Sequence, residues 1–365
     1  MYIHSVRLYF QRGKKSRNRN IKYIDMKRAL LLILFVIFYF ASCRQAKEPG
    51  FPVLKGSYLG QNPPGTTPVV FAPGIVSTGL YTRDIAISKD GTEIYFCISD
   101  AAATAILVTK LINNRWTEPA IAPFSGKGFF DFEPHISPDG TKFFFLSNRP
   151  PQGKEAKPGW FYQKIWMMNR TDTGWSEPQI VEEPISSENN EFFPSVTDEQ
   201  VLYFTRSTKN GTPMIYRSVF KNGSYENPER LSFPIPEKGM LFNSFISPKE
   251  DFLITCAQGI APTNIDQDYY ISFRMTDGGW SNLIKFGPEI NTPGDNANSA
   301  FVSPDGRYLF FCSSRKDAAM PQVTSGTPLS TIIRTKSMPG NGASAIYWVD
   351  AKIIEELRLK ENILK

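Results

Sequence analysis

A strand–turn–strand motif recurs five times along the chain, and this repetition restricts the fold more than any other feature. Each copy has a hydroxyl residue just before the turn, and these register marks are Ser88, Ser137, Thr197, Ser247 and Ser303. Their spacings are 49, 60, 50 and 56 residues. Repeats of about 40 to 50 residues are typical of propeller blades, whereas most helical solenoid repeats are shorter. The spacing therefore predicts an all-β fold class and a β-propeller.

The turn between the two strands favours a tight hairpin. In the second copy it reads Ser-Pro-Asp-Gly over residues 137–140, and aromatic residues begin the next strand. Pro presets φ, Asp bonds to nearby backbone and Gly accepts positive φ. The third copy, residues 197–200, and the fourth, with Lys249 and Glu250 at the turn, depart from the Pro-Asp-Gly pattern.

Two further strands follow each of the first four hairpins, so that each of these repeats holds four. Third strands are expected at residues 106–111, 165–169, 214–220 and 270–275. An aromatic residue then leads into the outer strand, at Trp116, Trp175, Tyr225 and Trp280. Nearby prolines fit an outer edge, where a missing backbone donor is tolerated. Four strands are the content of a propeller blade.

The last repeat lacks its own outer strand, and a segment near the N-terminus resembles the missing piece. Residues 67–73 align with residues 118–123, the outer strand of the first repeat. We expect residues 67–73 to pair with the third strand of the fifth repeat, at residues 346–350, and to close the ring. This predicts a five-bladed propeller over residues 67–350. A six-bladed ring is the alternative if an insertion hides a degenerate blade.

The repeats resemble a known family, the WD40-like Pro-Asp propeller repeat. The resemblance rests on residues 133–140 running into residues 145–149, on their echo at residues 303–306 and 313–315, and on a lead-in at residues 291–295. Such repeats occur in TolB-like proteins, in periplasmic lipoproteins of Bacteroidetes-type bacteria and in the propellers of prolyl-oligopeptidase-like peptidases. The resemblance implies a propeller and leaves the function open, because one fold hosts unrelated functions.

The N-terminus has the pattern of an export signal. An apolar run from Ala29 to Ala41 follows Lys27 and Arg28 and ends before Cys43. It is shorter than the roughly 20 residues that a spanning helix needs, and it has the composition of a secretory signal. Residues 40–43 resemble the lipobox of bacterial lipoproteins, in which the cysteine is acylated. An uncleaved anchor helix is the alternative.

These features divide the N-terminal part of the chain. Met26 begins a signal of normal length, so we expect residues 1–25 to be a mis-assigned extension, residues 26–42 the signal peptide and residues 43–66 a lipidated tether. Residues 44–47 include no acid that would retain the protein at the inner membrane. The expected location is the outer membrane, facing the periplasm.

The net charge argues against a nucleic-acid partner. The first 28 residues carry nine Lys or Arg and one acid, whereas the whole chain has a net charge of +6. The rest of the chain is therefore slightly acidic, and the basic character belongs to the leader.

The remaining cysteines are expected to be structural. Cys97, Cys256 and Cys312 each lie nine residues after a register mark. Equivalent positions on different blades are held apart by the ring, so we predict buried thiols without disulfide bonds.

The C-terminal tail, residues 351–365, is expected to form a short helix. Ile353 and Leu357 have i, i+4 spacing, and Asp350 can cap the helix start. We expect the helix to pack on the ring.

The chain lacks the motifs of several enzyme classes. His4 lies in the leader, so His135 is the one imidazole of the mature chain, which excludes sites built on two histidines. No GxSxG nucleophile motif, phosphate loop or dinucleotide fingerprint occurs in the sequence. We expect neither a metal site nor a cofactor.

Polar residues on the first strand of each repeat predict where a site would lie. These strands line the central channel of a propeller, and alternate side chains point into it. Asp84, Glu133 and Asn243 hold one ring position, and near it lie Asp131, Glu191, Asn298 and His135.

Two functional hypotheses follow from these residues. The first is a non-catalytic, membrane-tethered periplasmic propeller that binds a protein, a cell-wall component or a glycan at a channel mouth formed by Asp84, Glu133, His135, Asn243 and Asn298. In that case the acids satisfy backbone donors and water. The alternative is a glycoside hydrolase or lyase, in which two carboxyl groups act as acid and base or as nucleophile. Its candidate catalytic residues are Asp84, Glu133 and Glu191.

Overall fold

The computed structural model describes residues 50–100, 104–207, 211–260 and 266–363. Residues 53–365 form one compact unit. The expected signal peptide and Cys43 lie outside the described residues. Among the residues described, no helix has the length and apolar character needed to cross a membrane.

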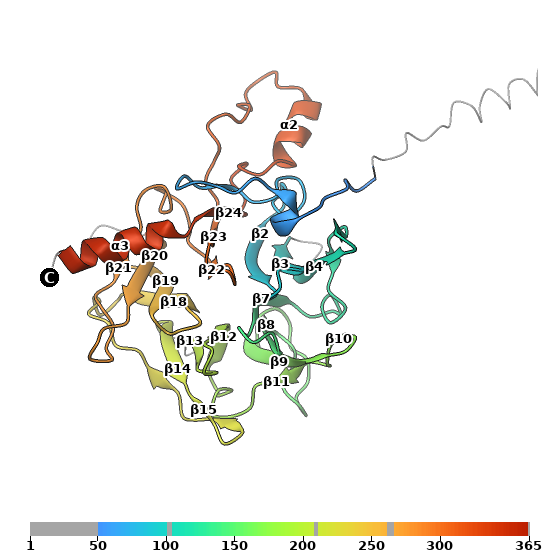
Figure 1. The fold of residues 1–365 in the computed structure, drawn as a ribbon. Helices are drawn as coiled ribbons and strands as arrows, with labels where there is room; N and C mark the ends of the chain where they lie inside the picture. Colours follow the sequence, from blue (N-terminus) through green and yellow to red (C-terminus); the bar gives the residue numbers. More distant parts are fainter. Residues whose placement is uncertain (1–49, 101–103, 208–210, 261–265, 364–365) are drawn as a thin grey trace, which may run out of the picture. The chain divides into compact units, whose positions relative to one another are not determined.

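Five sheets surround a common centre, as Figure 1 shows, and four of them are continuous in sequence. Blade 1 consists of β2 (Thr82–Ile87), β3 (Glu93–Ser99), β4 (Thr104–Ile112) and β6 (Ala120–Ile121). Blade 2 consists of β7 (Asp131–Ile136), β8 (Lys142–Ser147), β9 (Lys164–Thr171) and β11 (Gln179–Ile180). Blade 3 consists of β12 (Asn190–Val196), β13 (Leu202–Ser207), β14 (Met214–Ser218) and β17 (Glu229–Arg230). Blade 4 consists of β18 (Met240–Ile246), β19 (Phe252–Gln258), β20 (Asp268–Phe273) and β21 (Ile284–Lys285).

Short strand pairs extend three of these blades. β5 (Arg115–Trp116) pairs with the end of β4, and β10 (Gly174–Trp175) pairs with the end of β9. β15 (Phe220–Lys221) and β16 (Ser224–Tyr225) form a separate hairpin after β14. All three contain the turn and the aromatic residue expected before the outer strand.

Blade 5 joins the two ends of the propeller. It consists of β22 (Ala300–Val302), β23 (Tyr308–Ser313), β24 (Ala345–Asp350) and β1 (Val69–Val70), which comes from the N-terminal side. Val69 pairs with Trp348, and the Phe71 amide donates to the Ile346 carbonyl at 2.8 Å. The predicted closure is confirmed. The described residues form five four-stranded blades, so the six-bladed alternative is wrong for this part of the chain.

The folded unit begins earlier in the chain than the expected tether boundary at residue 66. The Trp116 indole N–H donates to the Gly56 carbonyl at 2.7 Å. A 3-10 turn, η1 (Ser57–Gly60), follows, in which the Tyr58 hydroxyl bonds to Asp305 at 2.9 Å and Leu59 is fully buried. Residues 54–61 therefore pack on blades 1 and 5.

The hairpin turns explain the recurring Ser and Asp. In blade 1 the Ser88 hydroxyl donates to Asp90 at 2.6 Å and accepts from the Glu93 amide at 2.9 Å, which closes the turn. The same Ser–Asp bond recurs in blades 2 and 5. Gly91 has φ of 71°, and in blades 3 and 4 Gln200 and Glu250 adopt φ of 59° and 57° at this position. The turn geometry is thus kept where the glycine is missing.

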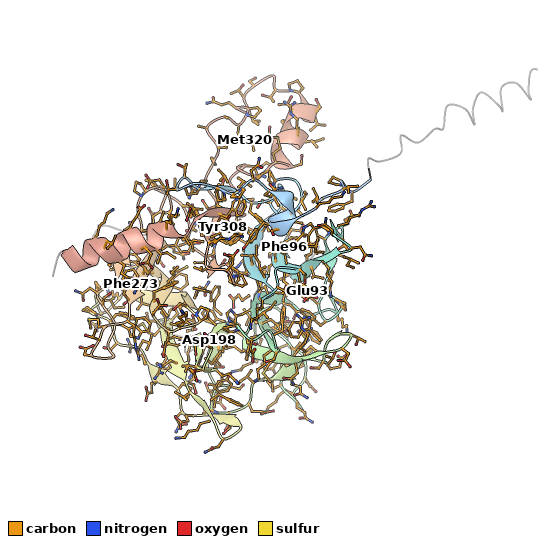
Figure 2. All side chains as sticks on the ribbon, viewed as in Figure 1. Glu93, Phe96, Asp198, Phe273, Tyr308 and Met320 are labelled. Carbon is orange, nitrogen blue, oxygen red and sulfur yellow. The ribbon has the colours of Figure 1, made fainter. Side chains whose placement is uncertain are left out.

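Large aromatic side chains fill the space between the blades. Figure 2 shows these side chains on the ribbon, with Phe96 of blade 1 and Tyr308 of blade 5 labelled. Tyr95 of blade 1 packs edge-on against Phe143 of blade 2, and Phe245 of blade 4 packs edge-on against Phe301 of blade 5. Burial of this apolar surface is the main force that holds the blades together.

The three described cysteines are free and buried, as predicted. Burial raises the pKa of Cys97, Cys256 and Cys312, so these residues remain thiols at neutral pH.

Two helices lie outside the sheets. The expected C-terminal helix is α3 (Lys352–Ile363), whose first amide donates to Asp350 at 2.9 Å. Arg358 of α3 bonds to Asp251 at 3.0 Å and lies over the Phe273 ring, so the helix packs on blade 4. The other helix, α2 (Leu329–Lys336), lies in the connection between β23 and β24 and was not expected.

Candidate functional site

The first strand of four blades bulges at the predicted ring position. Asp84, Glu133, Phe193 and Asn243 have φ of 51°, 58°, 52° and 51°, and the pairing with the second strand shifts at each of them. A bulge re-aims the side chain and leaves its backbone amide outside the ladder. Each of these amides therefore needs another acceptor.

The neighbouring blade supplies that acceptor. The Asp84 amide donates to the Ser299 hydroxyl at 3.3 Å, the Glu133 amide to Asp84 Oδ2 at 3.3 Å, and the Phe193 amide to Glu133 Oε2 at 2.7 Å. The next residue in this series, Phe193, has no acceptor on its side chain. The Asn243 amide therefore donates to the Thr205 hydroxyl of blade 3, at 2.9 Å. The two candidate carboxylates thus link one blade to the next.

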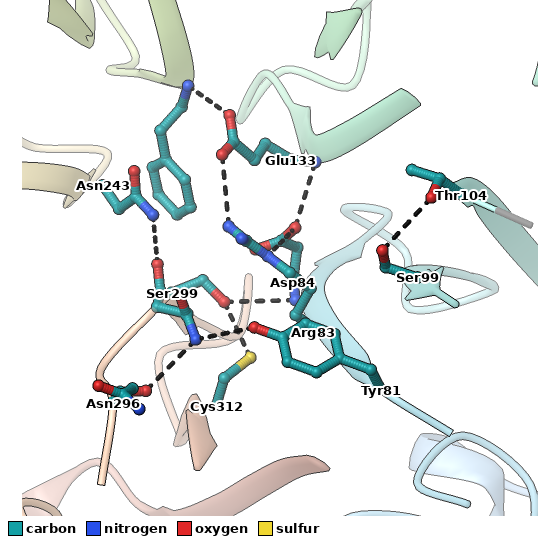
Figure 3. A network of polar contacts seen from close by, with 12 residues as sticks. Tyr81, Arg83, Asp84, Ser99, Thr104, Glu133, Asn243, Asn296, Ser299 and Cys312 are labelled. Carbon is teal, nitrogen blue, oxygen red and sulfur yellow. Dashed lines mark hydrogen bonds and ion pairs between the residues drawn. The ribbon is translucent and has the colours of Figure 1, made fainter. Parts of the chain in front are cut away.

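Arg83 completes this network and was not predicted from the sequence. Figure 3 shows its guanidinium between the two carboxylates, with Nε 2.9 Å from Asp84 Oδ2 and Nη2 3.3 Å from Glu133 Oε1. Burial raises the pKa of Glu133, Asp84 raises it further and Arg83 opposes the rise. Both Glu133 oxygens accept hydrogen bonds, so the geometry fits the ionised form.

The space beside these carboxylates is very small. Asp84 is 2% exposed and Glu133 is 6% exposed. The cavity that they line with His135 has a volume of about 20 Å³. That is room for about one water molecule and not for a sugar ring.

Glu191 and Asp131 do not join the Asp84–Glu133 pair. Glu191 is fully buried and contacts Lys164 Nζ at 2.6 Å and Arg206 Nε at 3.1 Å. Asp131 forms an ion pair with Arg149 and accepts from the Ser125 hydroxyl at 2.8 Å. The expectation that Glu191 belongs to a channel-mouth pair is not met, because its two oxygens are held by Lys164 of blade 2 and Arg206 of blade 3.

Asn243 and Asn298 contact each other. The Asn243 side-chain amide donates to the Asn298 carbonyl at 2.6 Å, and the Asn298 side-chain amide donates to the Tyr81 hydroxyl at 3.2 Å (Figure 3). Of the five predicted binding residues, three line the small cavity and these two do not.

His135 lies deeper in the channel and also links two blades. Its Nε2 accepts from the Val196 amide at 3.0 Å, which places the proton of the neutral ring on Nδ1. Burial lowers the pKa of His135 to about 4. With Phe245 and Phe301 it separates the small cavity from a much larger one.

The larger cavity, which we call the funnel, has a volume of about 750 Å³ and lies at the hairpin end of the ring. The β-branched residue before each register mark lines it, namely Ile87, Ile136, Val196, Ile246 and Val302. The residue after each mark lines it as well, namely Lys89, Pro138, Asp198, Pro248 and Pro304. Ile354 and Glu355 of α3 contribute one wall. The positions next to each register mark could have predicted this lining from the sequence.

The funnel combines an apolar interior with charged groups of both signs. Aromatic side chains come from Phe245, Phe252, Phe301 and Tyr308, and the charged residues include Lys249, Arg307, Asp251 and Asp350. No group of three or more His, Cys, Asp or Glu side chains in the described residues is arranged to hold a metal ion.

Acidification should destabilise the protein through His135. Its folded pKa of about 4 lies below the unfolded value of 6.5, so this contribution to stability is complete above pH 6.5 and is lost as the pH falls to 4. We expect the wild type to lose up to about 3 kcal/mol more than His135→Gln over this range. Gln can still accept from the Val196 amide but cannot titrate. Urea denaturation at pH 7, 5.5 and 4 measures the difference, and parallel pH profiles would contradict the prediction.

No protein-family model and no curated protein matches this chain. TolB from Acinetobacter baumannii has 17% identity and a TM-score of 0.45, over 74% of this chain and 57% of that one. A putative TolB from Agrobacterium tumefaciens has 12% identity and a TM-score of 0.44, over 74% and 90%. An N-acetylgalactosamine deacetylase from F. plautii has 10% identity and a TM-score of 0.45, over 82% and 95%. These similarities are too low to assign a family or a site.

Proposed function

We propose that this chain is a non-catalytic binding propeller of the bacterial envelope, held at the outer membrane by a lipid on Cys43 and facing the periplasm. Its ligand is a protein segment, a cell-wall component or a glycan, and its binding site is the funnel. The export signal and the cysteine that follows it support the anchor. Nothing in the charge of the mature chain favours nucleic acid as a partner.

The contrast in size between the two cavities carries this proposal. The funnel, at about 750 Å³, falls in the range of ligand sites, whereas the cavity at the carboxylates is about 20 Å³. Apolar walls with a few charged groups are typical of sites that bury part of a ligand and orient the rest.

The funnel chemistry also indicates which part of a ligand enters. Phe245 and Phe301 form its floor with His135, and burial keeps that imidazole neutral at physiological pH. The wall of the funnel carries positive charges on Lys89 and Lys249 and negative charges on Asp198 and Asp251. An apolar group is therefore expected at the floor, with polar or charged groups of the ligand nearer the hairpin turns.

Catalysis by a glycoside hydrolase or lyase is the second candidate. One observation favours it, because a carboxyl with a raised pKa beside a second carboxyl is typical of an acid–base pair. The bonds that Asp84 and Glu133 make to backbone amides and Arg83, and the lack of space, favour the structural role instead.

Titration calorimetry with three probe sets tests the binding site: muropeptides, arabinan and fructan oligosaccharides, and short apolar peptides. We expect at least one set to bind, and Phe252→Ala to weaken that binding about tenfold or more because Phe252 lines the funnel. Phe161→Ala is the control, since Phe161 is 50% exposed and does not line it. We expect its effect to stay within about twofold.

Two results would contradict the proposal. One is that no probe set binds the wild type. The other is turnover of an oligosaccharide that is lost in Glu133→Gln while the fold is unchanged, which would establish the catalytic alternative.

A further inference from the structure

The connection between β23 and β24 carries an exposed apolar surface that the funnel and the carboxylates do not use. It runs from residue 314 to residue 344, and Figure 1 shows α2 standing away from the five sheets. We call α2, Val323, Met338 and the adjoining Leu80 the α2 patch.

The helix presents its aliphatic side chains to solvent. Leu329 is 70% exposed and Ile333 is 60% exposed, and their i, i+4 spacing places them on one face. Thr335, in contrast, is buried on the opposite face. An amphipathic helix of a globular domain normally turns its apolar face toward the protein core. The apolar face of α2 points to solvent instead, so we expect it to contact an apolar surface outside this chain.

Other exposed aliphatic residues extend this face. Val323 and Met338 flank the helix and are exposed. Leu80 lies beside the end of α2, because the Asn341 side-chain amide donates to both the Gly79 and the Lys336 carbonyls. Of the eleven exposed large apolar residues in the described chain, five belong to the α2 patch, so exposed apolar side chains are concentrated in this patch.

The charge of the patch is positive. Arg334 and Lys336 lie in the last turn of α2 and are exposed. The sequence contains no Asp or Glu from residue 318 to residue 349. Aliphatic residues combined with Lys and Arg are typical of helices that lie in a membrane interface and bind anionic lipids.

Two features favour a lipid surface as the partner. The α2 patch combines exposed aliphatic side chains with cations and contains no acid, which matches the anionic surface of a bilayer. Cys43 precedes Val53 by only ten residues, and an extended tether of that length reaches about 35 Å at most. A propeller anchored there stays next to its membrane.

We propose that the α2 patch docks on an anionic phospholipid surface and orients the tethered propeller on the membrane. This inference rests on the proposed lipid anchor. The acyl chain holds the protein at the membrane, and the α2 patch determines which side of blade 5 faces the lipid.

Vesicle sedimentation tests this proposal with the chain from residue 43 onward carrying Cys43→Ser, so that no acyl chain contributes. We expect it to sediment with vesicles of phosphatidylethanolamine and phosphatidylglycerol, and about tenfold less with phosphatidylcholine vesicles. The double variant Leu329→Glu, Ile333→Glu should lose binding about tenfold or more, because it places two acids on the apolar face. Leu359→Glu on α3 is the matched control, since Leu359 is 61% exposed and lies outside the patch. Circular dichroism and thermal melting serve as controls that each variant is folded.

Separate readouts distinguish failure of this proposal from failure of the anchor. Labelled palmitate should enter the wild-type protein in cells and not the Cys43→Ser variant. Palmitate incorporation without vesicle binding would overturn the α2 proposal and leave the anchor standing. Vesicle binding without palmitate incorporation would overturn the anchor alone. If the parent chain does not bind vesicles and a photo-crosslinker at position 333 captures a protein in cells, the patch is a protein interface and the lipid proposal is wrong.

Discussion

A chain that begins at Ile75 is expected to aggregate, whereas a chain that begins at Val53 should fold as a monomer. The shorter chain loses β1 and the fully buried Phe71, whose ring packs against Phe310 and Trp348. It also exposes the edge of β24, whose backbone groups bond to β1 in the closed ring. An unpaired edge strand next to an exposed aromatic core is a site for aggregation. Size-exclusion chromatography and thermal melting measure both effects.

Intermediate variants separate ring closure from the packing of residues 54–61. A chain that begins at Thr66 retains β1 but loses Tyr58 and Leu59, so we expect a monomer of reduced stability. In the full unit, Phe71→Ala should cost about 3–5 kcal/mol because it leaves a cavity in the core. Val69→Ala, at an exposed position of the same strand, should cost less than about 1 kcal/mol. A monomeric Ile75 chain with the melting temperature of the Val53 chain would show that closure is not needed.

Arg83→Met should cost about 3–5 kcal/mol, the second large effect that we expect. The substitution leaves Asp84 and Glu133 buried without the cation that contacts both of them. Because the two carboxylates also accept amide bonds from neighbouring blades, the loss should weaken contacts between blades 1, 2 and 3. Urea denaturation measures the cost, and Arg115→Gln on the exposed part of β5 is the control, expected within about 0.5 kcal/mol.

A double-mutant cycle tests whether charge is the cause. In Glu133→Gln alone, the side-chain NH2 must face one of two donors, Arg83 Nη2 or the Phe193 amide, so we expect this variant to be destabilised. In the double variant Arg83→Met, Glu133→Gln, the carboxylate that Arg83 would have neutralised at position 133 is absent. We therefore expect the double variant to lose less free energy of unfolding than the sum of the two single losses. A cost below about 1 kcal/mol for Arg83→Met, or strict additivity, would show that this ion network is not structural.

The repeat register was enough to predict the blades, and the reason is local. Each hairpin has a hydroxyl at Ser88 or its equivalents and a residue with positive φ three positions later, and blades 1, 2 and 5 add an Asp two residues after the hydroxyl, so the pattern is visible in the sequence. Closure by residues 67–73 could be predicted because the same outer-strand pattern occurs at both ends of the chain. The capping of α3 by Asp350 is a contact between near neighbours and was predictable for the same reason.

The roles of Asp84, Glu133 and Glu191 could not be predicted from local sequence patterns. The sequence placed Asp84 and Glu133 at one ring position, but it did not indicate that each would accept the amide of the next blade's bulge. It also did not predict that Arg83 would lie between them, since the partner is 50 residues away along the chain. Glu191 was grouped with them because it lies on an inner strand, whereas its oxygens are held by Lys164 of blade 2 and Arg206 of blade 3.

By itself, the sequence therefore determined the all-β class, the five repeats, their register and the strand that closes the ring. These features depend on hydrophobic alternation and turn chemistry, which act between residues close in the chain. The tertiary structure alone decided which inner side chains meet, because closing the ring brings together first strands that lie 49 or more residues apart. The same closure narrows the passage at the carboxylates to about 20 Å³ and opens the funnel of about 750 Å³ at the hairpin end. The size of a cavity depends on how side chains from all five blades pack against each other, and no single repeat contains that information.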